Sequence, residues 1–238
     1  MKAMILAAGL GTRLKPFTDK HPKALAMVNG KSLLQRNIEY LQKIGITEVL
    51  VNVHHFADQI IDAVTTNNGW GSTITISDET SEVLETGGGL KKAAWYFENE
   101  TSFVLLNADI LTNLDLQAVI DAHTSTGALA TLAVSVRNSS RYFLFDKAGK
   151  LCGWKNQNTG AYKPAHLNDS NTEQLLAKAF SGIQVIDTKL LSMMHQTGKF
   201  SMVDVQQGDG MVIETPEGKI ILVDGGDNKL FARHVAAR

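Results

Sequence analysis

The sequence contains little cysteine, little net charge and no long apolar run. Cys152 is the single cysteine among 238 residues, so an intrachain disulfide is excluded and a reducing compartment is expected. A formal net charge of −1 gives no broad electrostatic attraction for nucleic acid or for a membrane surface. No apolar run approaches the roughly 18 residues of a membrane span, and the N-terminus lacks the apolar stretch of a signal peptide. We therefore expect a cytoplasmic protein that binds neither nucleic acid nor membrane.

The rest of the composition is typical of a globular protein. Hydrophobic residues make up 44% of the chain and charged residues 20%. A chain of this length can bury the core of one large α/β domain. Neither a repeat nor a linker interrupts it, so we predict a single domain over residues 1–238.

The most unusual stretch is residues 6–25, which begins in a predicted buried strand. Gly9 and Gly11 can take backbone angles closed to other residues, so the main chain can approach a ligand closely. Successive N–H groups in such a turn form a concave anion site. Pro16 and Pro22 each fix φ, so we expect this long loop to be ordered.

Positive charge in the same stretch indicates a pocket for a polyphosphate. Arg13, Lys15 and Lys23 supply it, and a guanidinium can bind a phosphate through two hydrogen bonds. A Walker A loop is excluded, because no Gly-x-x-x-x-Gly-Lys-Ser/Thr run occurs. The match to the dinucleotide fingerprint is also weak, because Leu14 replaces its third glycine and residues 51–55 contain no acid.

The stretch resembles the signature of the sugar nucleotidyltransferases (NDP-sugar pyrophosphorylases), G-x-G-T-R-L-x-P-x-T-x-x-x-P-K-x-L. A glycine-rich surface loop with scattered lysines would not reproduce this spacing. The resemblance implies an α/β fold, with a Rossmann-like, mostly parallel sheet and helices on both faces. The matching residues are Gly9, Gly11, Thr12, Arg13, Leu14, Pro16, Thr18, Pro22, Lys23 and Leu25.

The order of predicted elements favours the same fold class. Strands and helices alternate over the first half, as in a parallel sheet covered on both faces. A hairpin signal, a long polar loop at 156–171 and a strand at 180–186 follow. The strands of the first half are predicted at 3–8, 48–53, 73–76, 103–106 and 129–136, and the helices at 33–44, 57–64, 90–97 and 114–123.

Asp109 is the first candidate metal ligand, because it follows a buried strand. In open parallel sheets, ligands bind beyond the carboxyl ends of the strands. Mg²⁺ commonly takes one or two carboxylates together with phosphate oxygens. On position alone, Asp109 could instead cap a helix. In the nucleotidyltransferases the equivalent strand ends in a metal-binding aspartate, so the resemblance implies that Asp109 binds Mg²⁺.

Residues 85–89, Glu-Thr-Gly-Gly-Gly, are predicted to form a second glycine turn that opens a helix. The pattern alone fits a plain tight turn equally well. The resemblance places such a loop over the nucleobase, and its form is most similar to that of bacterial N-acetylmuramate 1-phosphate uridylyltransferases. The nucleotide-binding residues that the motif and the resemblance together imply are Ala7, Ala8, Gly9, Leu10, Gly11, Thr12, Arg13, Lys23, Glu85, Thr86, Gly87 and Asn107.

The family carries Glu-Lys-Pro after a later strand, where the lysine binds the sugar phosphate. The corresponding place here reads Gly-Trp-Lys-Asn, which makes Lys155 the candidate, although the glutamate and the proline are missing. Lys163, in Tyr-Lys-Pro, is a second candidate. Gly182 resembles the glycine that lies against the sugar in the family.

The C-terminal segment departs from the family pattern. The family ends with a second metal-binding aspartate in Trp-x-Asp-x-Gly-Thr, and Asp224 is the candidate here, without the tryptophan or the threonine. Two strands, 211–214 and 219–223, are predicted where the family has a helix. The segment also resembles the opening hairpin of metallo-β-lactamase-fold hydrolases. Their His-x-His-x-Asp-His motif is absent, so hydrolase activity is rejected.

These features together predict an enzyme that joins an NTP and a sugar 1-phosphate to give an NDP-sugar and pyrophosphate. Arg13, Lys23 and Asp109 are its expected catalytic residues, with Mg²⁺ as cofactor. UTP is the expected nucleotide, mannose-1-phosphate guanylyl transfer is the alternative, and a nucleotide-sugar-binding protein without catalysis is the second alternative. A homo-oligomer is left open. The expected parts are a nucleotide-binding half (1–136), a sugar-phosphate half (137–200) and a divergent C-terminal segment (201–238).

Overall fold

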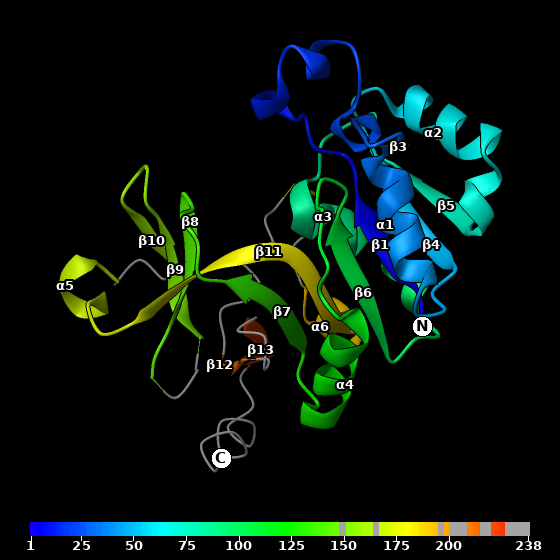
Figure 1. The fold of residues 1–238 in the computed structure, drawn as a ribbon. Helices are drawn as coiled ribbons and strands as arrows, with labels where there is room; N and C mark the ends of the chain where they lie inside the picture. Colours follow the sequence, from blue (N-terminus) through cyan, green and yellow to red (C-terminus); the bar gives the residue numbers. More distant parts are fainter. Residues whose placement is uncertain (148–150, 164–166, 195–197, 200–208, 215–219, 227–238) are drawn as a thin grey trace. The chain divides into compact units, whose positions relative to one another are not determined.

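The computed structural model describes residues 1–147, 151–163, 167–194, 198–199, 209–214 and 220–226 (Figure 1). The chain divides into two compact units. The first comprises Met1–Asn113 and Leu191–Met202, and the second Leu114–Leu190 and Val203–Arg238. The prediction of a single domain stays a prediction.

The first unit is built on a parallel sheet in the order β6-β1-β4-β5 (Figure 1). Consecutive residues of the central strand, Ala3, Met4 and Ile5, are all fully buried. Since successive side chains point to opposite faces, both faces of this strand are covered. The strands are β1 (Ala3–Leu6), β4 (Glu48–Val53), β5 (Thr73–Asp78) and β6 (Ser102–Asn107), which confirms the four predicted strands of this region.

The first two helices of the first unit each bury an apolar stripe. In α1, Ile38 and Leu41 are fully buried, and the Ser32 hydroxyl caps the helix by accepting a hydrogen bond from the Gln35 N–H at 3.1 Å. A short hairpin, β2 (Met27–Val28) and β3 (Lys31–Ser32), precedes it. The helices are α1 (Leu33–Gln42), α2 (Ala57–Thr66) and α3 (Glu85–Lys92).

The second unit carries an antiparallel sheet. The long strand β11 is hydrogen-bonded to β8 through its first residues and to β7 through the remainder, and it curves between the two in Figure 1. The described neighbours follow the order β10-β9-β8-β11-β7-β13-β12. The strands are β7 (Ala130–Ser135), β8 (Arg141–Phe145), β9 (Leu151–Asn156), β10 (Ala161–Lys163), β11 (Leu176–Asp187), β12 (Asp209–Glu214) and β13 (Ile220–Gly226).

Three further helices follow along the chain. They are α4 (Leu116–Thr126), α5 (Asp169–Thr172) and α6 (Lys189–Met193). Asp115 caps α4 by accepting a hydrogen bond from the Ala118 N–H at 3.1 Å. Across the ranges that the structure describes, no helix is both long and apolar enough to cross a bilayer.

Two local predictions are wrong. The segment 85–89 is not a turn before a helix, because Glu85–Lys92 forms α3 with the three glycines inside it, and Ala94–Phe97 follows as a 3₁₀ turn. The polar segment 156–171 is not only a loop, because it contains β10 and the first residues of α5. By contrast, the hairpin after residue 141 and the two C-terminal strands are confirmed.

A buried histidine makes the stability of the second unit depend on pH. His123 in α4 is only 4% exposed, and its Nδ1 lies 2.9 Å from the Thr131 hydroxyl of β7. Burial lowers the pKa of His123 from 6.5 to about 4, although the nearby Asp187 carboxylate acts in the opposite direction. His123 is therefore neutral in the folded protein at pH values where it is protonated in the unfolded chain.

We predict that the free energy of unfolding decreases in mild acid. The unfolded chain takes up the proton first, so the contribution of His123 is complete above pH 6.5 and is lost progressively towards pH 4. Between pH 7.5 and 5 the loss is about 2 kcal/mol. Urea unfolding of His123→Gln at the two pH values should show a smaller loss than wild type. The exposed His21→Gln is the control, and equal losses in all three proteins would contradict the assignment.

Candidate functional site

The predicted site in the first unit lies where three neighbouring strands end. Leu6, the last residue of β1, stands opposite Asn52 of β4 on one side and Asn107 of β6 on the other. The Ala108 N–H donates to the Leu6 carbonyl at 3.0 Å. The glycine loop and the segment with Asp109 therefore leave the sheet side by side, at the edge where open parallel sheets bind ligands.

The glycine loop makes a hydrogen-bonded turn at Gly11. Gly11 has a left-handed backbone (φ 64°), and its carbonyl accepts hydrogen bonds from the Thr18 hydroxyl at 3.0 Å and the Leu14 N–H at 2.9 Å. A Cβ on Gly11 would lie 2.8 Å from the Thr18 Cγ2 and 3.1 Å from the Lys23 Cβ. Thr18 is buried, so it cannot move aside easily. Both conformation and space thus require glycine here.

The loop brings two predicted catalytic residues into contact. The Lys23 ammonium forms an ion pair with the Asp109 carboxylate, and the two side chains are 25% and 30% exposed. The Asn37 amide holds the adjoining turn by donating to the Ala108 carbonyl at 2.9 Å and to the Leu33 carbonyl at 3.0 Å. Asn37 was missed by the sequence reasoning, and its only signal was a polar residue within an apolar helix.

Other predicted residues of the loop differ in exposure. Ala7 and Ala8 are buried, whereas Gly9, Leu10 and Thr12 are exposed. The Ala7 N–H donates to the Asn52 side chain at 2.8 Å, so it is not free for a ligand. Arg13 lies on the 3₁₀ turn Thr12–Leu14, and its side chain is outside the description.

The glycines of the second segment lie inside a helix and are packed closely against other parts of the unit. A Cβ on Gly88 would collide with the Gly198 carbonyl, and one on Gly89 would lie 2.6 Å from the Glu79 Oε1. Glycine therefore lets other backbone and side-chain atoms contact the helix directly. Glu85, with φ 60°, begins the helix, and Thr86 and Gly87 follow in its first turn.

Metal-ligating side chains do not cluster in the part of the chain that the structure describes. No group of three or more His, Cys, Asp or Glu side chains there could hold a metal ion. Asp109 nevertheless already contacts one cation, the Lys23 ammonium. Its carboxylate oxygens are the hard donors that Mg²⁺ prefers, and Mg²⁺ often takes its other ligands from phosphate and water. The residue present therefore fits a Mg²⁺ ion shared with a polyphosphate.

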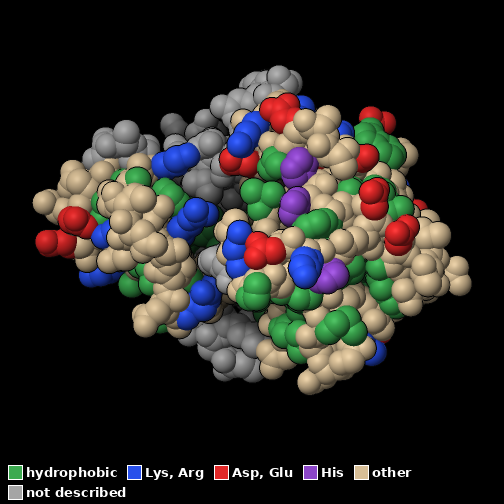
Figure 2. All heavy atoms as spheres, turned by 90° about the horizontal axis from the view of Figure 1, so that it is seen from above, with side chains coloured by type: hydrophobic (Ala, Val, Ile, Leu, Met, Phe, Trp, Pro, Cys, Tyr) green, Lys and Arg blue, Asp and Glu red, His purple; other side chains and the backbone are tan. Residues whose placement is uncertain are grey.

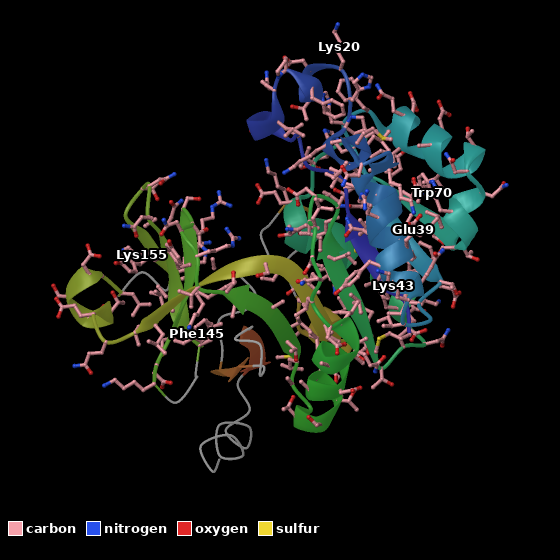
Figure 3. The ribbon with its side chains drawn as sticks, in the orientation of Figure 1. Lys20, Glu39, Lys43, Trp70, Phe145 and Lys155 are labelled. Atoms are coloured by element: carbon pink, nitrogen blue, oxygen red, sulfur yellow. The ribbon has the colours of Figure 1, made fainter. Side chains whose placement is uncertain are left out.

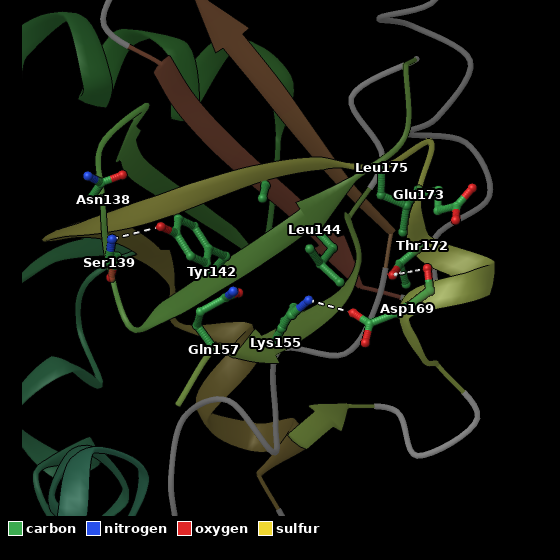
Figure 4. Close-up of a pocket in the computed structure, with 11 residues that line it drawn as sticks. Asn138, Ser139, Tyr142, Leu144, Lys155, Gln157, Asp169, Thr172, Glu173 and Leu175 are labelled. Carbon is green, nitrogen blue, oxygen red and sulfur yellow. Dashed lines mark hydrogen bonds and ion pairs between the residues drawn. The ribbon is translucent and has the colours of Figure 1, made fainter. Parts of the chain in front are cut away.

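The second unit has a cavity of ≈ 670 Å³ beside the predicted sugar-phosphate lysine (Figures 3 and 4). The Lys155 ammonium lies 2.7 Å from the Asp169 carboxylate, which also accepts a hydrogen bond from the Tyr162 hydroxyl. These two partners raise the pKa of Lys155, with Asp169 contributing most. The cavity is lined by Asn138, Ser139, Tyr142, Leu144, Lys155, Gln157, Asp169, Thr172, Glu173, Leu175 and Ala177.

The remaining predicted residues lie elsewhere in the second unit. Gly182 (φ 82°) occupies the irregularity in β11 between Phe180 and Gln184, and it is not among the described residues that line the cavity. Asp224 lies on β13, opposite Ala130 of β7, and its side chain is outside the description. Lys163 ends β10.

Surface charge is mixed on the face shown in Figure 2. Lys and Arg side chains lie close to Asp and Glu side chains there. Ion pairs in the first unit include Lys31–Glu39 and Lys15–Asp19. This agrees with the net charge of −1.

We predict that Gly11→Ala destabilises the fold whereas Gly9→Ala does not. Alanine at position 11 must adopt a left-handed backbone and displace Thr18, at a cost of about 1–2 kcal/mol for the backbone alone. A Cβ on Gly9 meets no atom within 4 Å. The measurement is the urea midpoint of each variant, and equal midpoints would contradict the described loop.

Comparisons with known proteins identify the family of the chain. The family model described as "Nucleotidyl transferase" matches residues 2–146. The N-acetylmuramate alpha-1-phosphate uridylyltransferase of Neisseria meningitidis serogroup B is 38% identical over 125 residues, 52% of this chain and 54% of that protein. The mannose-1-phosphate guanyltransferase of Debaryomyces hansenii is 33% identical over 145 residues, 60% of this chain and 40% of that protein.

The chain thus spans about half the length, or less, of these curated relatives. Among solved structures, a putative glucose-1-phosphate thymidylyltransferase from Bacillus anthracis superposes with a TM-score of 0.70 at 19% identity, over 87% of this chain and 81% of that chain. This likeness confirms the predicted fold class. Because the family model covers well over half of the sequence, including the glycine loop and Asp109, the chain belongs to the nucleotidyl transferase family.

Proposed function

We propose that the protein transfers a nucleotidyl group from an NTP to a sugar 1-phosphate, which gives an NDP-sugar and pyrophosphate. The observation that carries the proposal is the ion pair of Asp109 with Lys23, a residue whose Cβ would lie 3.1 Å from a Cβ on Gly11. A backbone turn, an ammonium and a carboxylate at one sheet edge are the groups that bind a polyphosphate with its metal ion. Membership of the nucleotidyl transferase family supports the same reaction class.

The reaction requires positioning and charge stabilisation rather than a covalent intermediate on the protein. A phosphate oxygen of the sugar 1-phosphate attacks the α-phosphorus in line, and the bond to the departing pyrophosphate breaks. We assign the leaving pyrophosphate to Arg13 and the Gly9–Thr12 backbone, and the α-phosphate to Lys23. The segment Glu85–Gly87, together with Asn107, is assigned to the nucleoside.

Asp109 is the residue that would hold Mg²⁺. Mg²⁺, when bound, would neutralise charge on the phosphate oxygens. The Lys23 ammonium contacts one oxygen of Asp109, so this lysine is well placed to exchange the carboxylate for a phosphate oxygen. Asp224 stays a prediction as second ligand.

Lys155 is assigned to the sugar phosphate, with Gly182 against the sugar. The polar lining of the cavity supports this assignment, because amide and hydroxyl groups such as those of Asn138, Ser139 and Gln157 suit a sugar. The carboxylate of Asp169 is 84% exposed, so water screens its attraction for Lys155. A dianionic phosphate can therefore replace Asp169 beside the ammonium.

The nucleobase is assigned to uracil first, with guanine as the alternative. The uridylyltransferase relative supports UTP, and the guanyltransferase relative supports GTP with mannose 1-phosphate. Backbone groups of a glycine segment can read either base, so the choice belongs to experiment.

Pyrophosphate release from a panel of NTPs and sugar 1-phosphates tests the proposal. We predict Mg²⁺-dependent release with UTP and a hexose-type or N-acetylmuramate-type 1-phosphate. Calorimetry with UTP and GTP side by side decides the base, and a preference of about tenfold for GTP, or roughly 1.4 kcal/mol, would overturn the uridylyl assignment alone. Nucleotide binding without turnover for any pair would favour a nucleotide-sugar-binding protein instead.

We predict that Asp109→Asn lowers turnover by on the order of a hundredfold at limiting Mg²⁺. The amide keeps the shape of the side chain but loses the charge that holds a hard cation. The fold should survive, because the ion pair with Lys23 is partly exposed to solvent.

Asp62→Asn is the matched control, because Asp62 is an exposed acid on α2 of the same unit. Lys23→Met separates loss of the ion pair from loss of the metal ligand. Wild-type dependence of turnover on Mg²⁺ concentration in Asp109→Asn would contradict the role of Asp109.

A further inference from the structure

Two buried polar side chains lie behind the site of the first unit without reaching its surface. Asn52, at the end of β4, is 2% exposed, and Glu79, directly after β5, is fully buried. The Asn52 amide donates to the Glu79 Oε1 at 2.8 Å. Burying an amide and a carboxylate is unfavourable unless both are hydrogen-bonded. A buried pair of this kind therefore indicates a specific structural role.

The pair is connected to the glycine loop on one side. The Asn52 Oδ1 accepts the N–H of Ala7 at 2.8 Å. Ala7 is the first residue after β1, and the glycine loop with Gly9 and Gly11 begins just after it. Asn52 therefore fixes the point from which the loop departs.

The pair is connected to α3 on the other side. The Glu79 Oε2 accepts the N–H of Leu84, the residue before α3, at 3.4 Å, and the Glu79 Oε1 fills the space that a Cβ on Gly89 would need. The backbone of Glu79 is itself held, because its N–H donates to the Val53 carbonyl at 2.7 Å. The Glu79 carboxylate thus contacts both the residue that precedes α3 and a residue in the middle of α3.

We propose that Asn52 and Glu79 are positioning residues that fix the glycine loop and the start of α3 relative to each other. The inference rests on the proposed function, in which the loop binds the phosphates and the start of α3 binds the base. A nucleotide touches both segments at once, so its affinity and alignment depend on the distance between them. A misplacement of about 1 Å at a reacting group can reduce the rate by on the order of a hundredfold.

The position of Glu79 also explains why residue 89, the third of the three glycines, is glycine. Gly87 belongs to the proposed base segment, and Gly88 faces the Gly198 carbonyl. Gly89 faces the carboxylate of Glu79, so a larger residue there would displace the very group that links the two segments.

Half-ligands separate positioning from a merely structural role. Glu79→Gln keeps the shape of the side chain but only one of its two accepted hydrogen bonds. The single amide oxygen can accept from Asn52 or from the Leu84 N–H, and the amide N–H₂ then faces the other donor. Calorimetry measures the binding of three ligands. Inorganic pyrophosphate needs the loop, the free nucleoside needs the start of α3 and Asn107 but not the loop, and the NTP needs both segments. We expect unchanged binding of each half-ligand and about a tenfold loss for the NTP, or roughly 1.4 kcal/mol.

Glu82→Gln is the control, because Glu82 is an exposed acid in the same connection between β5 and α3. Gly89→Ala disturbs the same contact by placing a Cβ against the Glu79 carboxylate. This variant provides the test if Glu79→Gln does not fold. It should reproduce the selective loss of NTP binding. Equal losses for all three ligands, or wild-type NTP binding in both variants, would overturn the inference. A wild-type protein that binds no NTP would overturn the proposed function as well.

Discussion

The register of β1 between β4 and β6 is the constraint on which the first unit depends. Because Leu6 stands opposite both Asn52 and Asn107, the glycine loop, the amide that holds Ala7 and the turn before Asp109 all begin at one level of the sheet. The register is fixed by burial, since β1 is covered on both faces and a shift by one residue would exchange the two sets of side chains. The free energy of core packing is therefore also what aligns the polar groups above it.

The sequence was informative wherever local pattern decides structure. The buried strands and the spacing of the glycine loop follow from apolar periodicity and a ten-position match. The errors arose where tertiary contacts decide. Residues 87–89 suggested a turn, because glycine in a sequence does not reveal whether it serves φ or close approach. Asn37, Asn52 and Glu79 were missed, because a polar residue gives no sign of burial until its partners are known.

The two glycine segments illustrate this ambiguity. Gly11 is required mainly by its left-handed backbone, whereas Gly88 and Gly89 have helical backbones and are required by what lies against them. The same residue type therefore has opposite consequences for local flexibility. In the loop it permits a conformation that other residues avoid, and in α3 it permits a contact that makes the helix more constrained.

The first unit is discontinuous, because Leu191–Met202 return to it after the first part of the second unit, Leu114–Leu190. Their contacts are with α3, where the Lys91 ammonium donates to the Leu191 carbonyl at 2.8 Å and Gly198 lies against Gly88. During synthesis, residues 1–113 thus emerge well before the segment that covers α3. The helix proposed to bind the base acquires its final packing only after residues 114–190 have been synthesised, so a nascent chain stopped within those residues already holds the phosphate loop but an incompletely packed base segment.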